Sequence, residues 1–292
     1  MEGFLELSFE LAGLDAARAE SACLASGAAA VTFSDDRDEP VLEPLPGELR
    51  LWAHTRVRAL FPRATEPLAA LLQLARALGR APGDIRARVI EDRPWEREWL
   101  RDFHARRFGR RLWVCPQHER VDVPDAVIVR LDPGMAFGTG THPSTALCLE
   151  WLDAQPPAAT LIDYGCGSGI LGIAAARLGA GAVHAFDIDP QALEATRQNA
   201  QRNGAAQLQV HASAASLPAR ADVLLANILA GPLCALAADF AARTAPAGQV
   251  VLAGLLEAQV AQVTAAYAAC FDVAMHGARE GWACLVGRRR AG

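Results

Sequence analysis

The sequence has no lysine, so all 28 of its fixed basic side chains are arginines, in a chain of 292 residues with a net charge of −5. Schiff-base chemistry and pyridoxal phosphate need a lysine amine, so both of these enzyme classes are excluded. The Walker A nucleotide loop is excluded as well, because its lysine must reach the phosphates. The acidic balance also argues against binding of nucleic acid over the whole surface.

Closely spaced metal ligands are missing too. The seven cysteines lie far apart, and no pair of them has the CxxC spacing of a zinc or redox site. The seven histidines contain no HExxH or HxxxH pair. We therefore expect reduced, mostly buried thiols and no metal site.

Long apolar runs are absent, because Arg, Asp or Gly interrupts every segment that approaches the length of a membrane span. The first ten residues carry acids, where a secretory signal would carry positive charge ahead of an apolar block. Over half of the residues are nevertheless apolar, which predicts a packed core. These patterns predict a cytoplasmic protein without a membrane partner.

Strand and helix patterns alternate over residues 1–92. Apolar and polar residues alternate in FLELSFE near the start, and strand patterns recur at residues 29–33, 49–60 and 85–90. Residues 14–25 and 67–78 have the apolar spacing of helices. The order βαββαβ predicts an N-terminal α+β, ferredoxin-like domain, a sheet with two helices on one face.

The composition shifts over residues 93–125, where several arginines stand beside tryptophan and phenylalanine. Such a surface suits an acidic partner or RNA. The plainer interpretation is a linker whose aromatic residues pack on the neighbouring domains while its charges face water. We favour the linker, with contact to RNA through its arginines as an incidental role.

A regular βα alternation fills residues 126–292. The chain ends in two strand patterns, residues 271–276 and 282–287, which a short turn joins. A short connection makes that pair antiparallel, since a parallel crossover needs a dozen residues or more. The prediction is an α/β domain with a doubly wound, seven-stranded, Rossmann-like sheet that has one reversed strand near its edge.

Residues 160–190 predict a βαβ unit with a glycine-rich turn. The turn contains Gly165, Gly167 and Gly169, and it lets a ligand approach the backbone where the next helix begins. Asp187 ends the second strand, roughly 20 residues after the turn, which is the spacing of an acid that accepts hydrogen bonds from a ribose. The unit therefore predicts a nucleoside-bearing ligand.

Two ligand classes fit this turn. Gly167, Gly169 and Gly172 have the GxGxxG spacing of a nicotinamide dehydrogenase. Asp163, just inside the turn, instead favours a ligand with an ammonium group over one with a pyrophosphate. The antiparallel pair at the end of the chain is also unlike the second half of a dinucleotide-binding fold.

The DxGxGxG turn and the later acid together resemble those of class I S-adenosylmethionine-dependent methyltransferases. The stretches LDPGMAFGTGTHPST, DYGCGSGILGIAA, AFDIDPQAL and LLANILAGPL are similar to the PrmA family, whose members methylate the large-subunit ribosomal protein L11. The resemblance is specific over residues 95–287 and looser before them. It implies S-adenosyl-L-methionine as the cofactor and an N-terminal substrate-recognition domain. It also implies methylation of L11, free or on the ribosomal subunit, at lysine side chains and the N-terminal α-amine.

The resemblance also implies site residues. Asn227, at the end of the fourth strand of the sheet, would aim the substrate amine through its amide oxygen, together with the backbone carbonyl of Ile228. Apart from the resemblance, we hypothesise that Phe137, in the glycine-rich loop FGTGTH, either covers the sulfonium or has a plain packing role, and that His142 is either a general base or a residue that starts a helix. The resemblance implies cofactor contacts at Thr145, Gly165, Asp187 and Asn227, and the full set of contacts that we predict adds Asp163, Gly167 and Phe137.

Three alternatives to a protein methyltransferase stay open. An RNA methyltransferase would use the same fold, and only the arginines of residues 93–125 favour it. A binding module would hold the cofactor without turnover. A dehydrogenase would bind NAD and not S-adenosylmethionine.

Overall fold

The computed structural model describes residues 4–37, 51–90, 104–131 and 140–290. The chain divides into two compact units, Met1–Trp95 and Glu96–Gly292, and each is described by itself. The finer division, with a separate linker over residues 93–125, stays a prediction. In the parts of the chain that the structure describes, no helix is long and apolar enough to cross a membrane.

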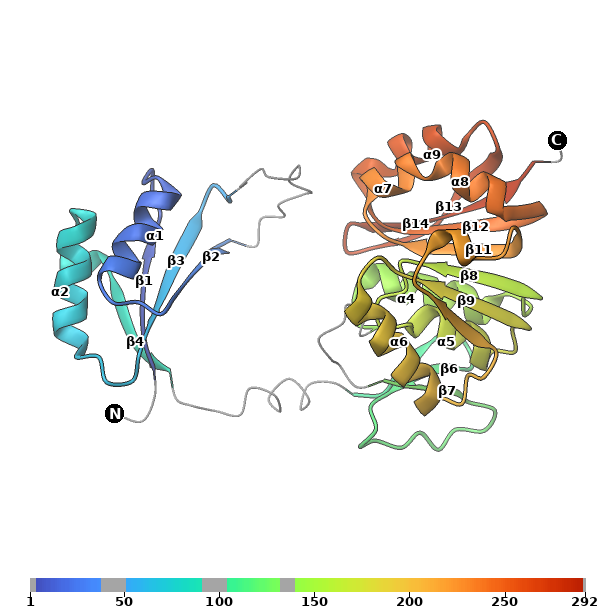
Figure 1. Cartoon of the computed structure of the whole chain (residues 1–292), viewed down its shortest axis with the longest axis horizontal. Coiled ribbons are helices and arrows are strands. Elements are labelled where there is room, and N and C mark those ends of the chain that lie inside the picture. Colours follow the sequence, from blue (N-terminus) through green and yellow to red (C-terminus); the bar gives the residue numbers. More distant parts are fainter. Residues whose placement is uncertain (1–3, 38–50, 91–103, 132–139, 291–292) are drawn as a thin grey trace. The chain divides into compact units, whose positions relative to one another are not determined.

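The first unit contains a four-stranded antiparallel sheet in the order β2-β3-β1-β4. Leu5, Leu7 and Phe9 alternate along β1 and are buried in one cluster with residues of both helices, so the helices cover the same face (Figure 1). The expected βαββαβ order is confirmed. Its elements are β1 (Phe4–Glu10), α1 (Ala16–Ala25), β2 (Ala30–Asp35), β3 (Thr55–Phe61), α2 (Pro67–Leu78), η1 (Pro82–Asp84) and β4 (Arg86–Ile90).

The second unit is organised around a seven-stranded sheet in the order β10-β9-β8-β11-β12-β14-β13. All neighbouring pairs are parallel except those that β14 makes with β12 and β13, which confirms the single reversed strand next to the edge. The strands are β8 (Thr160–Tyr164), β9 (Ala182–Phe186), β10 (Leu208–His211), β11 (Ala221–Asn227), β12 (Thr244–Leu256), β13 (Phe271–Arg279) and β14 (Trp282–Arg289).

Helices cover both faces of this sheet (Figure 1). One buried cluster joins the sheet to α4 and α5, and a second joins its other face to α7, α8 and α9, so the sheet is doubly wound. The helices are α4 (Pro143–Ala154), α5 (Ile170–Arg177), α6 (Pro190–Arg202), α7 (Ala230–Ala235), α8 (Ala237–Arg243) and α9 (Val260–Tyr267), with short turns η3 (Ala214–Ser216) and η4 (Glu257–Gln259).

A separate three-stranded sheet adds to the α4 and α5 side. It has the order β5-β6-β7, with β5 (Arg106–Phe108), β6 (Leu112–Cys115) and β7 (Val127–Arg130). The sequence suggested that the last of these begins the βα alternation of the main sheet. It pairs with β6 instead, and Phe108, Val114 and Val129 are buried in the core that α4 shares with the main sheet.

Candidate active site

The glycine-rich turn joins β8 to α5 at the carboxyl edge of the main sheet. The backbone amides of Gly165 and Cys166 both donate to the carbonyl of Phe186, at 2.7 and 3.0 Å, and so tie the turn to the end of β9. Gly165 has a φ of 78°. A Cβ at this position would lie 2.4 Å from Cγ2 of Ile228, so only glycine fits between the turn and the Ile228 side chain.

Two polar side chains of α6 donate hydrogen bonds to backbone carbonyls of the glycine-rich turn. The Thr196 hydroxyl donates to the Gly167 carbonyl at 3.0 Å, and the Asn199 amide donates to the Ser168 carbonyl at 2.9 Å. Both side chains are buried. Our sequence analysis missed them, although two polar residues three positions apart on the inner face of a helix could have drawn attention to this role.

Asp187 lies at the carboxyl end of β9, half-buried. One carboxylate oxygen accepts from the Gly167 amide at 2.9 Å, and the other accepts from the Asp189 amide at 3.0 Å. Each oxygen keeps lone-pair capacity for a further donor. The side chain is therefore held in a fixed orientation beside the turn and can still accept from a ligand.

Asp163 is the most deeply buried acid of the site, with 1% of its surface exposed. Its Oδ2 accepts from the Gly172 amide at 2.8 Å. Its Oδ1 is buried and finds no hydrogen-bond partner among the residues that the structure describes. Burial raises the pKa of this carboxyl to about 7, the charge of Asp187 adds to the rise, and the Gly172 amide opposes it.

Thr145 and Asn227 meet at the carboxyl end of β11, the strand next to β8. Thr145 is buried in the first turn of α4, and Asn227 is the half-buried last residue of β11. The Asn227 Nδ2 donates to the Thr145 hydroxyl at 3.1 Å. The bond fixes the rotation of the amide and leaves its oxygen as the group that can accept from a second partner. The next peptide is held too, since the Ile228 amide donates to Ala253.

His142 acts as the residue that starts α4. Its Nδ1 accepts from the Ser144 amide at 3.3 Å, and the ring packs edge-on against Trp282 with centroids 4.5 Å apart. Burial lowers the pKa of this imidazole. Because Nδ1 is engaged as a helix cap, this geometry favours the helix-start interpretation over the general base. Phe137 lies outside the described residues.

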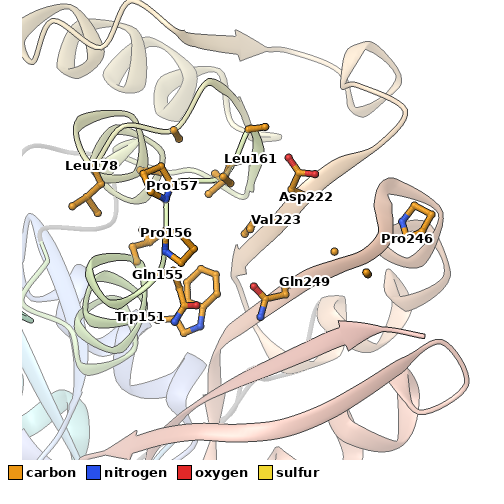
Figure 2. Close-up of a pocket in the computed structure, with 17 residues that line it drawn as sticks. Trp151, Gln155, Pro156, Pro157, Leu161, Leu178, Asp222, Val223, Pro246 and Gln249 are labelled. Carbon is orange, nitrogen blue, oxygen red and sulfur yellow. The ribbon is translucent and has the colours of Figure 1, made fainter. Parts of the chain in front are cut away.

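A cavity of about 400 Å³ lies at the opposite, amino edge of the sheet (Figure 2). Trp151, Leu161, Val223 and Gln249 are among the residues that line it, and none of the predicted site residues does. Its one lining acid, Asp222, already accepts from a backbone amide, that of Thr160, at 2.8 Å. In open α/β sheets, ligands bind beyond the carboxyl ends of the strands, so the cavity is not the candidate site.

Over the described ranges, no three His, Cys, Asp or Glu side chains gather in a way that could hold a metal ion. The polar groups of the carboxyl edge are instead arranged around a glycine-rich turn, which is the arrangement of a small-molecule cofactor site.

The comparisons with known proteins agree with this geometry. The family model for ribosomal protein L11 methyltransferase (PrmA) matches residues 3–290. A ribosomal protein L11 methyltransferase of Alkalilimnicola ehrlichii is 47% identical over 289 residues, covering 98% of each chain. Another, from Pseudomonas aeruginosa, is 50% identical over 276 residues, covering 93% of this chain and 94% of that protein.

A solved structure supports the fold. The crystal structure of a ribosomal protein L11 methylase from Lactobacillus delbrueckii subsp. bulgaricus superposes with a TM-score of 0.59 at 31% sequence identity. The match covers 65% of this chain and all of that one. The chain belongs to the PrmA family of ribosomal protein L11 methyltransferases.

Proposed function

We propose that the chain transfers methyl groups from S-adenosyl-L-methionine to amines of ribosomal protein L11. The observation that carries the proposal is the carboxyl edge of the main sheet. There the Asp163 Oδ1, buried and without a hydrogen-bond partner among the described residues, lies beside the glycine-rich turn, and Asn227, at the end of the neighbouring strand β11, bonds to Thr145 of α4. Membership of the PrmA family supports both the donor and the acceptor.

The residues at this edge fit the cofactor. An ammonium group would supply the donor that the Asp163 Oδ1 does not find among the described residues, and a ribose would use the remaining hydrogen-bonding capacity of the Asp187 carboxylate. The side chain of Ile228 occupies the space that a Cβ of residue 165 would need, so glycine at this position keeps the turn close to the end of β11. When bound, S-adenosyl-L-methionine supplies a methyl group on a positively charged sulfur. Thr145 and Gly167 complete the contacts we propose, and Phe137 over the sulfonium stays a prediction.

The chain's own task is then to aim an amine. The Asn227 amide oxygen and the Ile228 carbonyl are two acceptors that can hold amine hydrogens and direct the nitrogen lone pair. Alignment of this kind contributes roughly 7 to 11 kcal/mol in well-oriented systems, so no strong general base is required. An amine beside a cationic sulfur also has a lowered pKa, by desolvation and by like charge, which favours its neutral form.

The amines we propose are lysine side chains and the N-terminal α-amine of L11, presented free or on the large ribosomal subunit. The resemblance to the family is the support for these targets, and a cytoplasmic location goes with them. The N-terminal unit is the part of the chain we assign to substrate recognition.

One labelling experiment tests the proposal against its alternatives. The protein is incubated with methyl-labelled S-adenosylmethionine and ribosomes from a strain that lacks the enzyme, and protein and RNA are then separated. We expect label in L11 alone, and mass spectrometry of its peptides should place the label on lysine side chains and the α-amine. Label only in RNA would contradict the proposal. Tight binding of the cofactor without transfer would indicate a binding module, and affinity for NAD alone would indicate a dehydrogenase.

A further inference from the structure

Two histidines contact each other on neighbouring strands of the main sheet. His184 lies in the middle of β9, and His211 is the last residue of β10. The His184 Nδ1 and the His211 Nε2 are 3.0 Å apart, and both side chains are half-buried. Because β10 is an edge strand and β9 ends just before Asp187, the contact links the edge of the sheet to the strand that leads to the proposed site.

A chain of hydrogen bonds extends from this pair into the loop after β10. The Ser216 hydroxyl donates to the Ser213 carbonyl at 2.7 Å, so its oxygen accepts from the His211 Nδ1, 3.1 Å away. In the neutral His211 ring only Nε2 is then left as an acceptor, and the His184 Nδ1 donates to it. Burial lowers the pKa of both imidazoles, and the His211 ring adds to the lowering at His184, which favours the neutral forms. The chain therefore has one direction, from His184 to the backbone of the loop.

The loop in question, residues 212–217, begins beside Asp187. His211 is paired with Phe186 in the parallel register of β10 and β9. The next residue of each strand, Ala212 and Asp187, therefore leaves the sheet at the same edge, from strands that are about 5 Å apart. The loop is thus a direct neighbour of the acid that we assign to the ribose.

The far end of this loop is fixed in the core, whereas its middle is exposed. Leu217 is buried in the cluster that also contains Phe186. Ala212 and Ser213 are exposed. The backbone amides of Ser213 and Ala214 donate to no partner among the residues that the structure describes. The loop therefore presents free hydrogen-bond donors next to Asp187.

The order of the proposed contacts gives the direction in which the cofactor extends. In S-adenosyl-L-methionine the amino-acid part and the base are attached to opposite ends of the ribose. We assign the ammonium group to Asp163 of β8 and the ribose to Asp187, at the end of β9. The base then lies beyond the carboxyl end of the next strand, which is β10.

We propose that His184 and His211 are positioning residues, which hold the loop of residues 212–217 in the conformation that receives the base of the cofactor. The proposal rests on the proposed function, because it needs the same cofactor at the same edge. The free amides of Ser213 and Ala214 are donors that N1 of adenine can accept from. N1 of hypoxanthine carries a hydrogen instead, so the same amides would reject that base.

Cofactor binding by the full chain tests the proposal. Titration calorimetry compares S-adenosylhomocysteine with S-inosylhomocysteine, whose base is hypoxanthine. His184→Ala removes the first donor of the chain, so affinity for the adenine ligand should fall by about five- to tenfold, and the preference for adenine should shrink by the same factor. His184→Asn should restore both to within twofold, because its amide nitrogen can donate from the position of Nδ1. Ser216→Ala breaks the same chain at an exposed residue and should act like His184→Ala.

Gln207→Ala is the matched control. The Gln207 amide donates to the Ala176 carbonyl at 2.8 Å and so ties the start of β10, the end opposite the loop, to α5. Its loss should lower the melting temperature and leave the preference for adenine within twofold. An equal loss of preference in Gln207→Ala and His184→Ala would show that only the stability of β10 matters, and would overturn the proposal. Circular dichroism checks that every variant is folded.

The tautomers of the two rings give a second readout. The chain requires a hydrogen on Nδ1 of both His184 and His211, which long-range proton–nitrogen NMR spectra at slightly alkaline pH would show. A hydrogen on Nε2 of either neutral ring would overturn the proposal. Failure of the unaltered protein to bind S-adenosylmethionine would overturn the proposed function as well. Normal binding with unchanged affinity and base preference in His184→Ala would overturn the positioning role alone.

Discussion

The two edges of the seven-stranded sheet differ in a way that locates the site. The amino edge has a cavity of about 400 Å³, but its one lining acid is already bonded to the backbone. The carboxyl edge has a glycine whose Cβ position is blocked and a buried carboxylate oxygen without a partner in the described parts of the chain. The functional edge is therefore identified by a buried polar atom that still needs a hydrogen-bond donor, and not by the presence of a cavity.

The largest effect that would test this contrast is expected from Gly165→Ala. The new methyl group would lie 2.4 Å from Ile228 at a φ of 78°, so either the turn or the Asn227–Ile228 segment must shift. We expect cofactor affinity to fall by about 100-fold or more, since a shift of about 1 Å is enough for an effect of that size. Isothermal titration calorimetry with S-adenosylmethionine measures it.

Gly204→Ala is the matched control for backbone strain. Gly204 also has a positive φ, 61°, but nothing lies within 4 Å of its Cβ position. The left-handed conformation alone costs roughly 1 to 2 kcal/mol of stability. Gly204→Ala should therefore lower the melting temperature and leave cofactor affinity within twofold. If both variants lost cofactor affinity equally, the close packing of Ile228 against residue 165 would have no special role in cofactor binding.

The next largest effects are expected from Asp187→Ala and Asn227→Ala, which test whether Asp187 binds the cofactor and Asn227 orients the substrate. Asp187→Ala removes a carboxylate that also holds the Gly167 amide, so cofactor affinity should fall by about tenfold or more. Asn227→Ala should leave cofactor affinity within threefold and lower kcat for L11 by about 100-fold, because the amine is no longer aimed. Titration calorimetry and steady-state rates separate the two. An equal loss of cofactor affinity in both would remove Asn227 from the substrate side.

A smaller, pH-dependent effect is expected at Asp163. Its pKa is raised to about 7, so below this pH the Asp163 carboxyl is ionised in only a minority of molecules. A ligand with an ammonium group would bind only that ionised form. Cofactor affinity should rise up to about tenfold per unit between pH 5.5 and 7, where the ligand's α-amine stays protonated. Binding titrations across this range measure the slope. A flat profile in the unaltered protein would show that no proton leaves Asp163 on binding.

The same carboxyl predicts the pH dependence of stability without cofactor. A raised carboxyl pKa contributes stability that is fully present below the ordinary value near 4 and is lost as the pH rises through about 7. Asp163→Asn removes this titration. The unfolding free energy should therefore decline less between pH 5 and pH 8 in the variant, as urea unfolding at several pH values would show. An unchanged pH dependence would contradict this.

The sequence predicted the fold well because its signals are local. The glycines of the turn, the order of apolar runs and the short turn before Trp282 were enough to predict a doubly wound sheet with one reversed strand, which the structure confirms. The site positions that depend on packing were harder. Thr196 and Asn199 bond to carbonyls of the turn that lie about 30 residues earlier in the sequence. β7 pairs with β6 and not with a strand of the main sheet. Both features depend on tertiary contacts, which the local sequence does not reveal.

The smallest effect is expected at the amino edge, and it completes the contrast. Gln249 and Asn227 are both amides on adjacent, paired strands, but Gln249 lines the cavity whereas Asn227 bonds to Thr145 at the other end. Gln249→Ala should change kcat and cofactor affinity by less than twofold and stability by about 0.5 kcal/mol at most. The same assays as for Asn227→Ala make the two truncations directly comparable. A larger loss of kcat or cofactor affinity in Gln249→Ala would mean that the cavity is energetically coupled to the site. The two edges would then have to be treated as one functional unit.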